Sequence, residues 1–393
     1  MTPSVVVPRV ERPLVSVVMV VYGQWGWTRR ALHALVARTP PVYELVVVDN
    51  ASPGRTGAEL REQVAGARIV GADHNTGFGV GNDLGVLHSR AEHVVLLNSD
   101  CLVEPGWLEP MLERVERDPS VGAVAGKLLD LDGTLQEGGS LLDRDATTRA
   151  YGRGAGPMDP QASFPRDVLF GSAGFLLLRR AAFDAVGGFD PVFTPAYFED
   201  VDLALALEAR GYRCVYEPRS IARHVREAST PSGTSGALMK AHRPIVQERW
   251  GERLATLPTL AEVDRYPHRA YAVRDALTAE RVLVVGPDPA WLPGIAARAA
   301  RTPWIRWTVV DARVDPAAMA SGVEFATGEP GAELEARRFH ASFVVVGPRA
   351  PAGAEPAIRR TQPQATTLDS VEQLDDRAEP AVTAASRPPR PRG

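Results

Sequence analysis

ELVVVDNASPG, residues Glu44–Gly54, decides the fold class of this chain. It joins an apolar run that is rich in Val to a carboxylate and then to a turn-forming segment. Such an uninterrupted run is typical of a strand that is buried on both faces, as in parallel sheets. Similar runs occur at Leu14–Val21 and His93–Leu97, and segments with helical spacing of apolar residues separate them. The alternation predicts an α/β fold with a parallel sheet.

Two acidic residues lie at the ends of predicted strands. Asp49 comes after Glu44–Val48, and Asp100 comes shortly after His93–Leu97. Ligands of open α/β sheets bind beyond the carboxyl ends of the strands. We therefore expect both carboxylates to face one crevice.

Length and composition predict a large domain with smaller additions. The chain has 393 residues, of which 45% are hydrophobic and 23% charged, with a formal net charge of −4. This gives no reason to expect a nucleic-acid partner. We expect a flexible segment at 1–13, the main domain at 14–250, a small α/β unit at 251–348 and a disordered tail at 349–393.

The small unit is predicted from three short apolar runs. They are RVLVVG at Arg281–Gly286, WTVV at Trp307–Val310 and SFVVVG at Ser342–Gly347. The first resembles a Rossmann strand, but the GPDP that ends it lacks the glycine fingerprint of dinucleotide-binding folds. The last residues are rich in Ala, Pro and Arg, a composition that predicts disorder.

Cysteine content and hydropathy suggest a cytoplasmic protein. The two cysteines, Cys101 and Cys214, are too few for a disulfide framework and suit a reducing compartment. No signal peptide is expected, because the first residues lack a long apolar core. No run of about 18 uncharged apolar residues predicts a membrane span. Peripheral contact with the inner face of a membrane, through an acceptor lipid, stays open.

Several ordered motifs together resemble one enzyme family. Besides ELVVVDNASPG they are HNTGFGVGND (His74–Asp83), VVLLNSDCLV (Val94–Val103) and the segment Val168–Tyr212. Over roughly Leu14–Arg226 the chain resembles glycosyltransferase family 2, and within it the bacterial rhamnosyltransferase-like enzymes. The resemblance implies a GT-A fold, a Rossmann-like mixed sheet flanked by helices.

The resemblance also implies a reaction. It is the inverting transfer of a sugar from a dTDP- or UDP-linked donor, with dTDP-rhamnose as one candidate, to a hydroxyl group. The acceptor would be a glycan, a lipid-linked sugar or a small natural product.

The donor site is expected in the first half of the chain. In the family, the residue that matches Asp49 accepts a hydrogen bond from the imide N–H of uracil or thymine, although Asp is also an ordinary turn residue. The residues expected to contact the donor are Tyr22, Asp49, Asn50, Asn75, Gly77, Phe78, Asn82, Asn98 and Ser99.

The glycines of His74–Asp83 allow two interpretations. Gly77, Gly79 and Gly81 let the backbone approach a ligand, or they form a glycine-rich helix entrance. Their G-x-G-x-G spacing differs from G-x-G-x-x-G, and they do not follow the first strand. An NAD-dependent enzyme is therefore disfavoured.

A metal site is expected around Asn98-Ser99-Asp100, where the family places its D-x-D motif. A divalent ion there neutralises the departing diphosphate, and oxygen ligands suit Mg²⁺ or Mn²⁺. Asn98 removes one charge from the motif and leaves Asp100 as the direct ligand. The resemblance adds His224 as a second ligand, although a lone His and an N-S-D turn also have purely structural explanations.

The catalytic base is expected in FEDVD, Phe198–Asp202. The resemblance assigns that role to Asp200, with Glu199 beside it. Asp202, together with Gly171 and Ser172, is expected to bind the acceptor. Neighbouring carboxylates raise one another's pKa, which suits a base near neutral pH. Acids in a first helical turn are otherwise explained by the helix dipole.

Two further alternatives stay open. A sugar nucleotidyltransferase needs a glycine-rich loop with Arg or Lys after its first strand, and YGQWGWT at Tyr22–Thr28 is a different sequence. A nucleotide-sugar-binding protein without activity is compatible with Asn98 in place of an acid.

Overall fold

A computed structural model describes residues 3–157, 162, 165–225, 234–257, 259–261, 280–301, 305–311, 313, 323–326, 341, 343–361 and 365–374. The chain divides into two compact units, Met1–Leu260 and Ala261–Gly393. The expected boundary at residue 250 falls inside helix α7 (Thr234–Leu254), so the first unit extends ten residues further than predicted.

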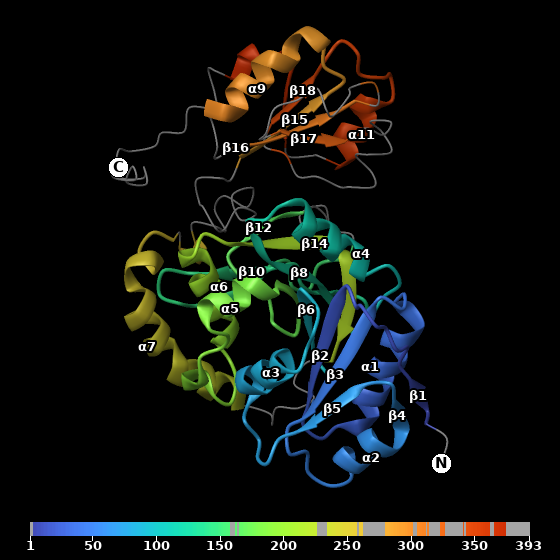
Figure 1. Ribbon diagram of the computed structural model, residues 1–393. Coiled ribbons are helices and arrows are strands. Elements are labelled where there is room, and N and C mark those ends of the chain that lie inside the picture. The colour runs from blue at the N-terminus through green and yellow to red at the C-terminus, as the bar shows by residue number, and fades with distance from the viewer. Residues whose placement is uncertain are drawn as a thin grey trace. The chain divides into compact units, whose positions relative to one another are not determined.

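The first unit is built on a ten-stranded mixed sheet (Figure 1). The strands β2, β3, β5 and β6 are parallel, and β13 joins them to β8 through antiparallel pairing. In spatial order the main path is β12 (Arg166–Val168), β14 (Arg213–His224), β8 (Val121–Leu129), β13 (Phe175–Arg179), β6 (His93–Leu97), β2 (Val15–Val21), β3 (Tyr43–Asp49) and β5 (Arg68–Gly71).

Six short strands of the first unit lie outside this path, among them β1 (Val5–Val6) and β4 (Val64–Ala65), which pair with each other. Two others matter for the site: β7 (Cys101–Val103) pairs with β14, and β9 (Leu135–Glu137) pairs with β8. The last two, β10 (Ser140–Leu142) and β11 (Thr148–Ala150), form an antiparallel pair of their own.

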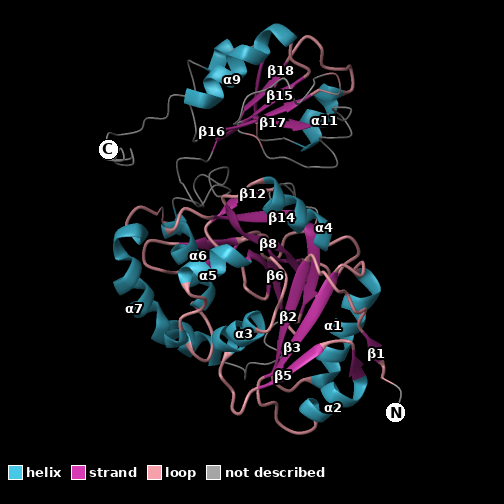
Figure 2. Ribbon diagram, viewed as in Figure 1, coloured by secondary structure: helices cyan, strands magenta, loops and turns pink. Residues whose placement is uncertain are grey.

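Helices cover both faces of the sheet (Figure 2). Apolar residues of α1 (Trp25–Arg38), α2 (Thr56–Gln63) and α4 (Leu108–Arg117) fill the core on one face. Residues of α3 (Phe78–Leu87), α5 (Arg180–Val186) and α6 (Glu199–Ala209) fill the core on the other face. A short 3₁₀ helix, η2 (Pro191–Phe193), precedes α6. This three-layer arrangement confirms the predicted α/β fold. No described helix is long and apolar enough to cross a membrane.

The N-terminal segment differs from the prediction of a flexible stretch at 1–13. Strand β1 (Val5–Val6) pairs in parallel with β4 (Val64–Ala65). Val5 and Val7 are 1% and 2% exposed, within the core that α1 covers. Burial of these apolar side chains stabilises the segment, which is why it is ordered where a flexible stretch was expected.

The glycines of α3 let this helix lie close to the sheet. A Cβ atom on Gly85 would lie 2.3 Å from Cγ1 of Val18, and one on Gly81 would lie 2.9 Å from Cγ1 of Val20. Neither space admits a methyl group. Of the two interpretations of this glycine-rich stretch, close helix packing is therefore the one observed for its helical part.

The second unit contains a five-stranded parallel sheet in the order β17-β16-β15-β18-β19. The prediction of a small α/β unit is borne out by these elements, but its expected end at residue 348 is wrong. Leu368 and Val371 are buried in the core of the unit, so the chain beyond 348 contributes to it. Residues 375–393 of the expected tail lie outside the described residues. The elements are β15 (Glu280–Val285), η4 (Pro289–Trp291), α9 (Leu292–Arg301), β16 (Ile305–Val310), β17 (Val323–Ala326), β18 (Phe343–Val346), α11 (Ala354–Thr361), β19 (Thr366–Leu368) and η6 (Glu372–Leu374).

Candidate active site

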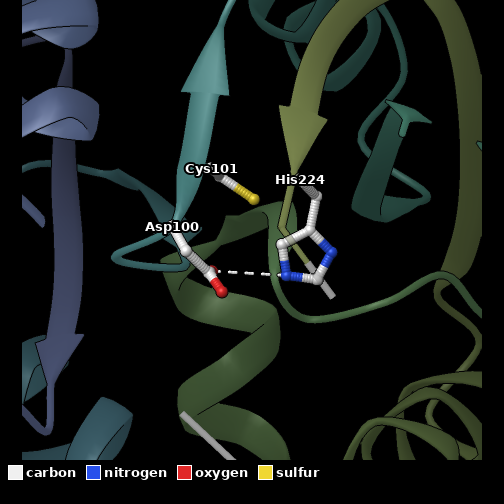
Figure 3. Close-up of side chains that lie close together, drawn as sticks. All are labelled: Asp100, Cys101 and His224. Carbon is white, nitrogen blue, oxygen red and sulfur yellow. Dashed lines mark ion pairs between the residues drawn. The ribbon is translucent and has the colours of Figure 1, made fainter. Parts of the chain in front are cut away.

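Asp100 and His224 come together because β7 pairs with the end of β14. In this antiparallel ladder His224 lies opposite Cys101, the residue after Asp100. Nε2 of His224 lies 3.3 Å from Oδ1 of Asp100, and their side chains are 14% and 8% exposed. Figure 3 shows this contact and the thiol beside it. Two side chains that are far apart in the sequence thus form the group that was predicted to bind metal.

Cys101 completes the cluster of three potential ligands around this point. Burial, and secondarily Asp100, raises the pKa of its thiol well above the usual value. Its Sγ lies 3.5 Å from the backbone oxygen of Gly174, to which the thiol donates. A protonated, hydrogen-bonded thiol is a poor ligand. The carboxylate of Asp100 and the imidazole of His224 are therefore the groups that fit a divalent ion.

Asn98 lies against the same histidine. Its Nδ2 is 3.3 Å from Nε2 of His224, and its backbone N–H donates to the oxygen of Gly174 at 2.8 Å. Ser99 is 6% exposed. Asn98 therefore contributes an uncharged amide where the family motif has an acid.

The predicted donor residues Asn50 and Asn75 are hydrogen-bonded to the protein. The Asn50 amide donates to Oδ1 of Asn75 at 3.1 Å and to the oxygen of Gly77 at 2.9 Å. Its own Oδ1 accepts from the backbone N–H of Thr76 at 2.9 Å. Oδ1 of Asn75 also accepts from the N–H of Gly77 at 3.0 Å. We name residues 50 and 75–77 the asparagine clamp, since their bonds hold the loop before α3.

Gly77, Phe78 and Asn82 lie in the first half of α3 or directly before it, and the first two contact a later loop. Gly77 has φ 84°, and a Cβ there would lie 2.8 Å from the oxygen of Pro195. That oxygen accepts from the backbone N–H of Phe78 at 2.7 Å. Asn82 is buried and donates to the oxygen of Phe78 at 2.9 Å within the helix. Gly77 and Phe78 thus contact the loop that leads into α6.

Asp49 lies at the carboxyl end of β3, as predicted. Its Oδ1 accepts from the backbone N–H of Ser52 at 3.0 Å, and Nη1 of Arg61 lies 3.6 Å from its Oδ2. The turn interpretation of Asp49 is therefore realised, and recognition of a base by it stays a prediction. Tyr22, at the end of β2, is 38% exposed.

The loop before Asp200 has an unusual backbone. Tyr197 and Phe198 have φ 75° and 72°, in the left-handed region that non-glycine residues rarely adopt. Nδ1 of His242, on α7, donates to the oxygen of Tyr197 at 2.9 Å. Strained residues that neighbouring elements hold in place are frequent at functional sites.

Glu199 and Asp200 begin α6 and have raised pKa values. Burial is the first cause of the rise in the pKa of Asp200 to about 7, and the charge of Glu137 is the second. Burial and the charge of Asp200 raise the pKa of Glu199 well above its usual range. Oε2 of Glu199 has no hydrogen-bond partner among the described residues. A carboxylate that titrates near neutral pH is suited to be a general base.

Glu137, on β9, was missed by the sequence analysis. It is 9% exposed, and its Oε1 accepts from the backbone N–H of Ser172 at 2.9 Å. The next N–H in the chain, of Ala173, faces the Asp200 carboxylate. Two adjacent backbone groups thus hold two carboxylates side by side. Nothing in the sequence around Glu137 distinguishes it from an ordinary surface acid.

Asp202 is hydrogen-bonded to the protein, and its contact with an acceptor stays a prediction. Its carboxylate accepts from Nη1 of Arg249 at 2.9 Å and from Nε1 of Trp250 at 2.8 Å, and it is 6% exposed. It ties α6 to α7. The acid that faces Asp200 is therefore Glu137 rather than Asp202, because the side chain of Asp202 is used by this ion pair.

Gly171 and Ser172 lie beside Glu137, in the loop between β12 and β13. A Cβ on Gly171 would lie 2.3 Å from Cβ of Ala125, so glycine is needed there for packing. The hydroxyl oxygen of Ser172 accepts from the N–H of Gly174 at 3.2 Å. Both residues shape the loop that lies between the pair Asp100 and His224 and the acids Glu137 and Asp200. Contact of Gly171 and Ser172 with an acceptor stays a prediction.

Comparison with known proteins shows which proteins the chain is similar to. The family model described as "Glycosyl transferase family 2" matches residues 16–187. The chain is 30% identical over 226 residues to the O-antigen biosynthesis protein RfbC of Myxococcus xanthus, covering 55% of this chain but only 18% of RfbC. It is 26% identical over 257 residues to the N-acetylglucosaminyl-diphospho-decaprenol L-rhamnosyltransferase of Mycobacterium tuberculosis H37Rv, covering 58% of this chain and 82% of that protein.

A solved structure supports the fold. The structure of GalNAc-T7 with UDP, GalNAc and Mn²⁺ matches with a TM-score of 0.52 and 17% identity, over 63% of this chain and 49% of that one. At this identity the likeness concerns the fold alone, which is GT-A. Residues 16–187 therefore match glycosyltransferase family 2, a rhamnosyltransferase is among the relatives, and the first unit has the GT-A fold.

Proposed function

We propose that the chain is an inverting, metal-dependent glycosyltransferase that moves a sugar from a nucleoside diphosphate sugar to an acceptor hydroxyl. One observation carries this proposal. A pair of metal-binding groups, Asp100 and His224 at 3.3 Å, occurs in the same unit as a desolvated carboxylate, Asp200, whose pKa is about 7. A metal ion held by the pair would neutralise the departing diphosphate, and the carboxylate would accept the proton of the attacking hydroxyl.

Asp200 performs the proton transfer in this proposal. The acceptor oxygen attacks the anomeric carbon, the bond from that carbon to the phosphate oxygen breaks, and the hydroxyl proton passes to the Asp200 carboxylate. Burial and the charge of Asp200 raise the pKa of Glu199, and Asp200, with a pKa of about 7, is the acid of the pair to which we assign the proton transfer.

Asp100 and His224 would hold Mg²⁺ or Mn²⁺. A bound divalent ion would act as a Lewis acid on the leaving diphosphate. Carboxylate and imidazole are both ligands of such ions in proteins, although oxygen ligands predominate for Mg²⁺.

The donor is proposed to be dTDP- or UDP-linked, with dTDP-rhamnose first. The name of the mycobacterial relative supports rhamnose and a lipid-linked acceptor, and the structure of GalNAc-T7 holds UDP. The donor residues proposed on the crevice side are Tyr22, Asp49, Asn98 and Ser99. A lipid-linked acceptor would bring the enzyme to a membrane surface.

A transfer assay with the full chain tests the proposal. Release of nucleoside diphosphate is measured with dTDP-rhamnose and UDP-sugars, with and without a polyprenyl diphosphate sugar acceptor. EDTA should abolish turnover and Mn²⁺ or Mg²⁺ should restore it. Asp100→Asn should lower the rate strongly, while Asp184→Asn, at an exposed ion pair on α5, should not. Full activity in EDTA would exclude the metal role.

The alternative is a nucleotide-sugar-binding protein without activity. Asn98 favours it, because the amide supplies no charge to the metal-side group. Tight donor binding without transfer to any acceptor would support this alternative.

A further inference from the structure

Gln136 lies next to the imidazole of His224, and its amide can have only one orientation. Its Nε2 donates to Oδ1 of Asp130 at 2.9 Å and to the backbone oxygen of His224 at 3.2 Å. A carboxylate and a carbonyl only accept hydrogen bonds. Rotating the amide by 180° would place its oxygen against both acceptors, so the NH₂ group must face them.

This orientation fixes the proton on the imidazole of His224. The remaining atom of the Gln136 amide, Oε1, lies 2.7 Å from Nδ1 of His224. Oxygen of an amide accepts, so Nδ1 must carry the proton. In the neutral ring, Nε2 then has a free lone pair.

The Nε2 atom that carries this lone pair lies near Asp100 and Asn98. Nε2 of His224 is 3.3 Å from Oδ1 of Asp100. In the neutral ring Nε2 and the carboxyl oxygen of Asp100 can both accept, so a cation or the nearby Asn98 amide can serve both atoms. Nδ2 of Asn98, at 3.3 Å from Nε2, is consistent with an accepting nitrogen there.

The chain connects Gln136 to this point through a hairpin. Strand β9 pairs with the end of β8, and Asp130 directly follows β8. The backbone N–H of Asp130 donates to the oxygen of Thr134 at 2.8 Å and closes the turn. Asp130 and Gln136 therefore belong to one short hairpin, which its own hydrogen bonds stabilise and which contacts β14 at His224.

We propose that Gln136 is a positioning residue that selects the Nδ1–H tautomer of His224 and so presents Nε2 to a divalent cation. The inference rests on the proposed function, in which Asp100 and His224 hold that cation. Loss of such an outer partner of a metal-bound histidine lowers metal affinity by about 10–100-fold.

The experiment measures Mn²⁺ binding to the full chain by calorimetry, without substrate. Gln136→Met keeps the length of the side chain and removes its hydrogen bonds, and should weaken binding by about 10–100-fold. Gln247→Met is the matched control, because Gln247 is exposed and its Nε2 donates to the oxygen of Asp145 instead. The control should bind Mn²⁺ like the wild type.

A second readout does not depend on metal. Long-range ¹⁵N–¹H spectra of histidine-labelled protein report which ring nitrogen carries the proton, and His224→Ala assigns the signal. Wild type should show Nδ1–H at His224 at a pH where the ring is neutral. Gln136→Met should lose this preference.

Gln136→Glu separates tautomer selection from a merely structural role. It keeps an acceptor for the Nδ1–H group but loses the donor to Asp130. It should therefore bind Mn²⁺ more tightly than Gln136→Met. Equal losses in both variants would show that Gln136 only anchors the hairpin and would overturn the inference.

Two other outcomes also overturn it. They are an Nε2–H tautomer in the wild type, and Mn²⁺ affinity unchanged in Gln136→Met. If wild type transfers sugar and binds Mn²⁺ but Gln136→Met does the same, the inference alone fails. If wild type binds no Mn²⁺, the metal role in the proposed function fails as well.

Discussion

The asparagine clamp and the acids around Asp200 differ in how far their polar side chains are hydrogen-bonded to the protein. In the clamp, the side chains of Asn50 and Asn75 are hydrogen-bonded to each other and to the backbone of residues 76 and 77. Around Asp200, two other carboxylates, Glu137 and Glu199, lie close by, and Oε2 of Glu199 has no partner among the described residues.

This difference indicates that the clamp stabilises the fold, whereas the acids serve the reaction. A fully satisfied polar network stabilises one conformation of a loop. Crowded carboxylates are unfavourable for folding, and perturbed pKa values of this kind concentrate at functional sites. We therefore expect substitutions in the clamp to change stability and substitutions among the acids to change the rate of transfer.

The largest effect is expected at Asp200. Asp200→Asn keeps the shape and removes the proton affinity, so transfer should fall by about 10²–10⁴-fold while donor binding survives. Single-turnover transfer with saturating donor measures this.

Asp202→Asn is the control for Asp200→Asn. Asp202 lies two residues further along α6 but is bound to Arg249 and Trp250, so its loss should lower the melting temperature more than the rate. A near wild-type rate in Asp200→Asn would place the base elsewhere.

Asn50→Ala should break the clamp. It leaves the backbone groups of Thr76 and Gly77 without their side-chain partner and should cost about 1–3 kcal/mol of unfolding free energy. Asn75→Ala should cost less, because Asn75 is exposed and water replaces it. Urea unfolding compares the two. Equal stability of Asn50→Ala and wild type would contradict the scaffold role.

Gly85→Ala tests whether the glycines of α3 serve packing. The new methyl group would lie 2.3 Å from Val18 and 3.2 Å from Val48, and should cost about 1–3 kcal/mol. Gly26→Ala on α1 is the control, since nothing lies within 4 Å of a Cβ there. Thermal unfolding should show the control unchanged or slightly stabilised. A stabilised Gly85→Ala would instead point to a ligand-facing role.

The smallest effect is a shift in pH dependence. With a pKa of about 7, Asp200 is protonated at lower pH, so transfer should rise as pH increases through about 7. Glu137→Gln removes a facing negative charge and should move this rise to lower pH, whereas Glu109→Gln on the surface of α4 should not. An unchanged profile in Glu137→Gln would remove Glu137 from the site.

The same pKa has a consequence for stability. The folded state binds the Asp200 proton more tightly than the unfolded chain, whose value is near 3.8. The contribution of this group to the free energy of unfolding should therefore decrease as pH rises from about 4 to about 7. Unfolding of wild type and Asp200→Asn over this range measures it.

The amino-acid sequence by itself determined the local elements and the strand-end residues. Runs such as Val15–Val21 and Tyr43–Asp49 are buried on both faces, so their composition alone identifies them. Asp49 and Asp100 follow such strands, and the motif carrying Asp200 begins a helix as predicted. These features depend on neighbouring residues only.

Tertiary structure alone decided which side chains meet. His224 lies beside Asp100 because β14 pairs with β7. Glu137 lies near Asp200 because adjacent backbone N–H groups of the loop before β13 contact both carboxylates. Arg249 on α7 forms an ion pair with Asp202, a partner that the local sequence does not reveal. Hydrophobic periodicity encodes which face of a segment is buried, but not which distant segment covers it, because that choice depends on packing of the whole sheet.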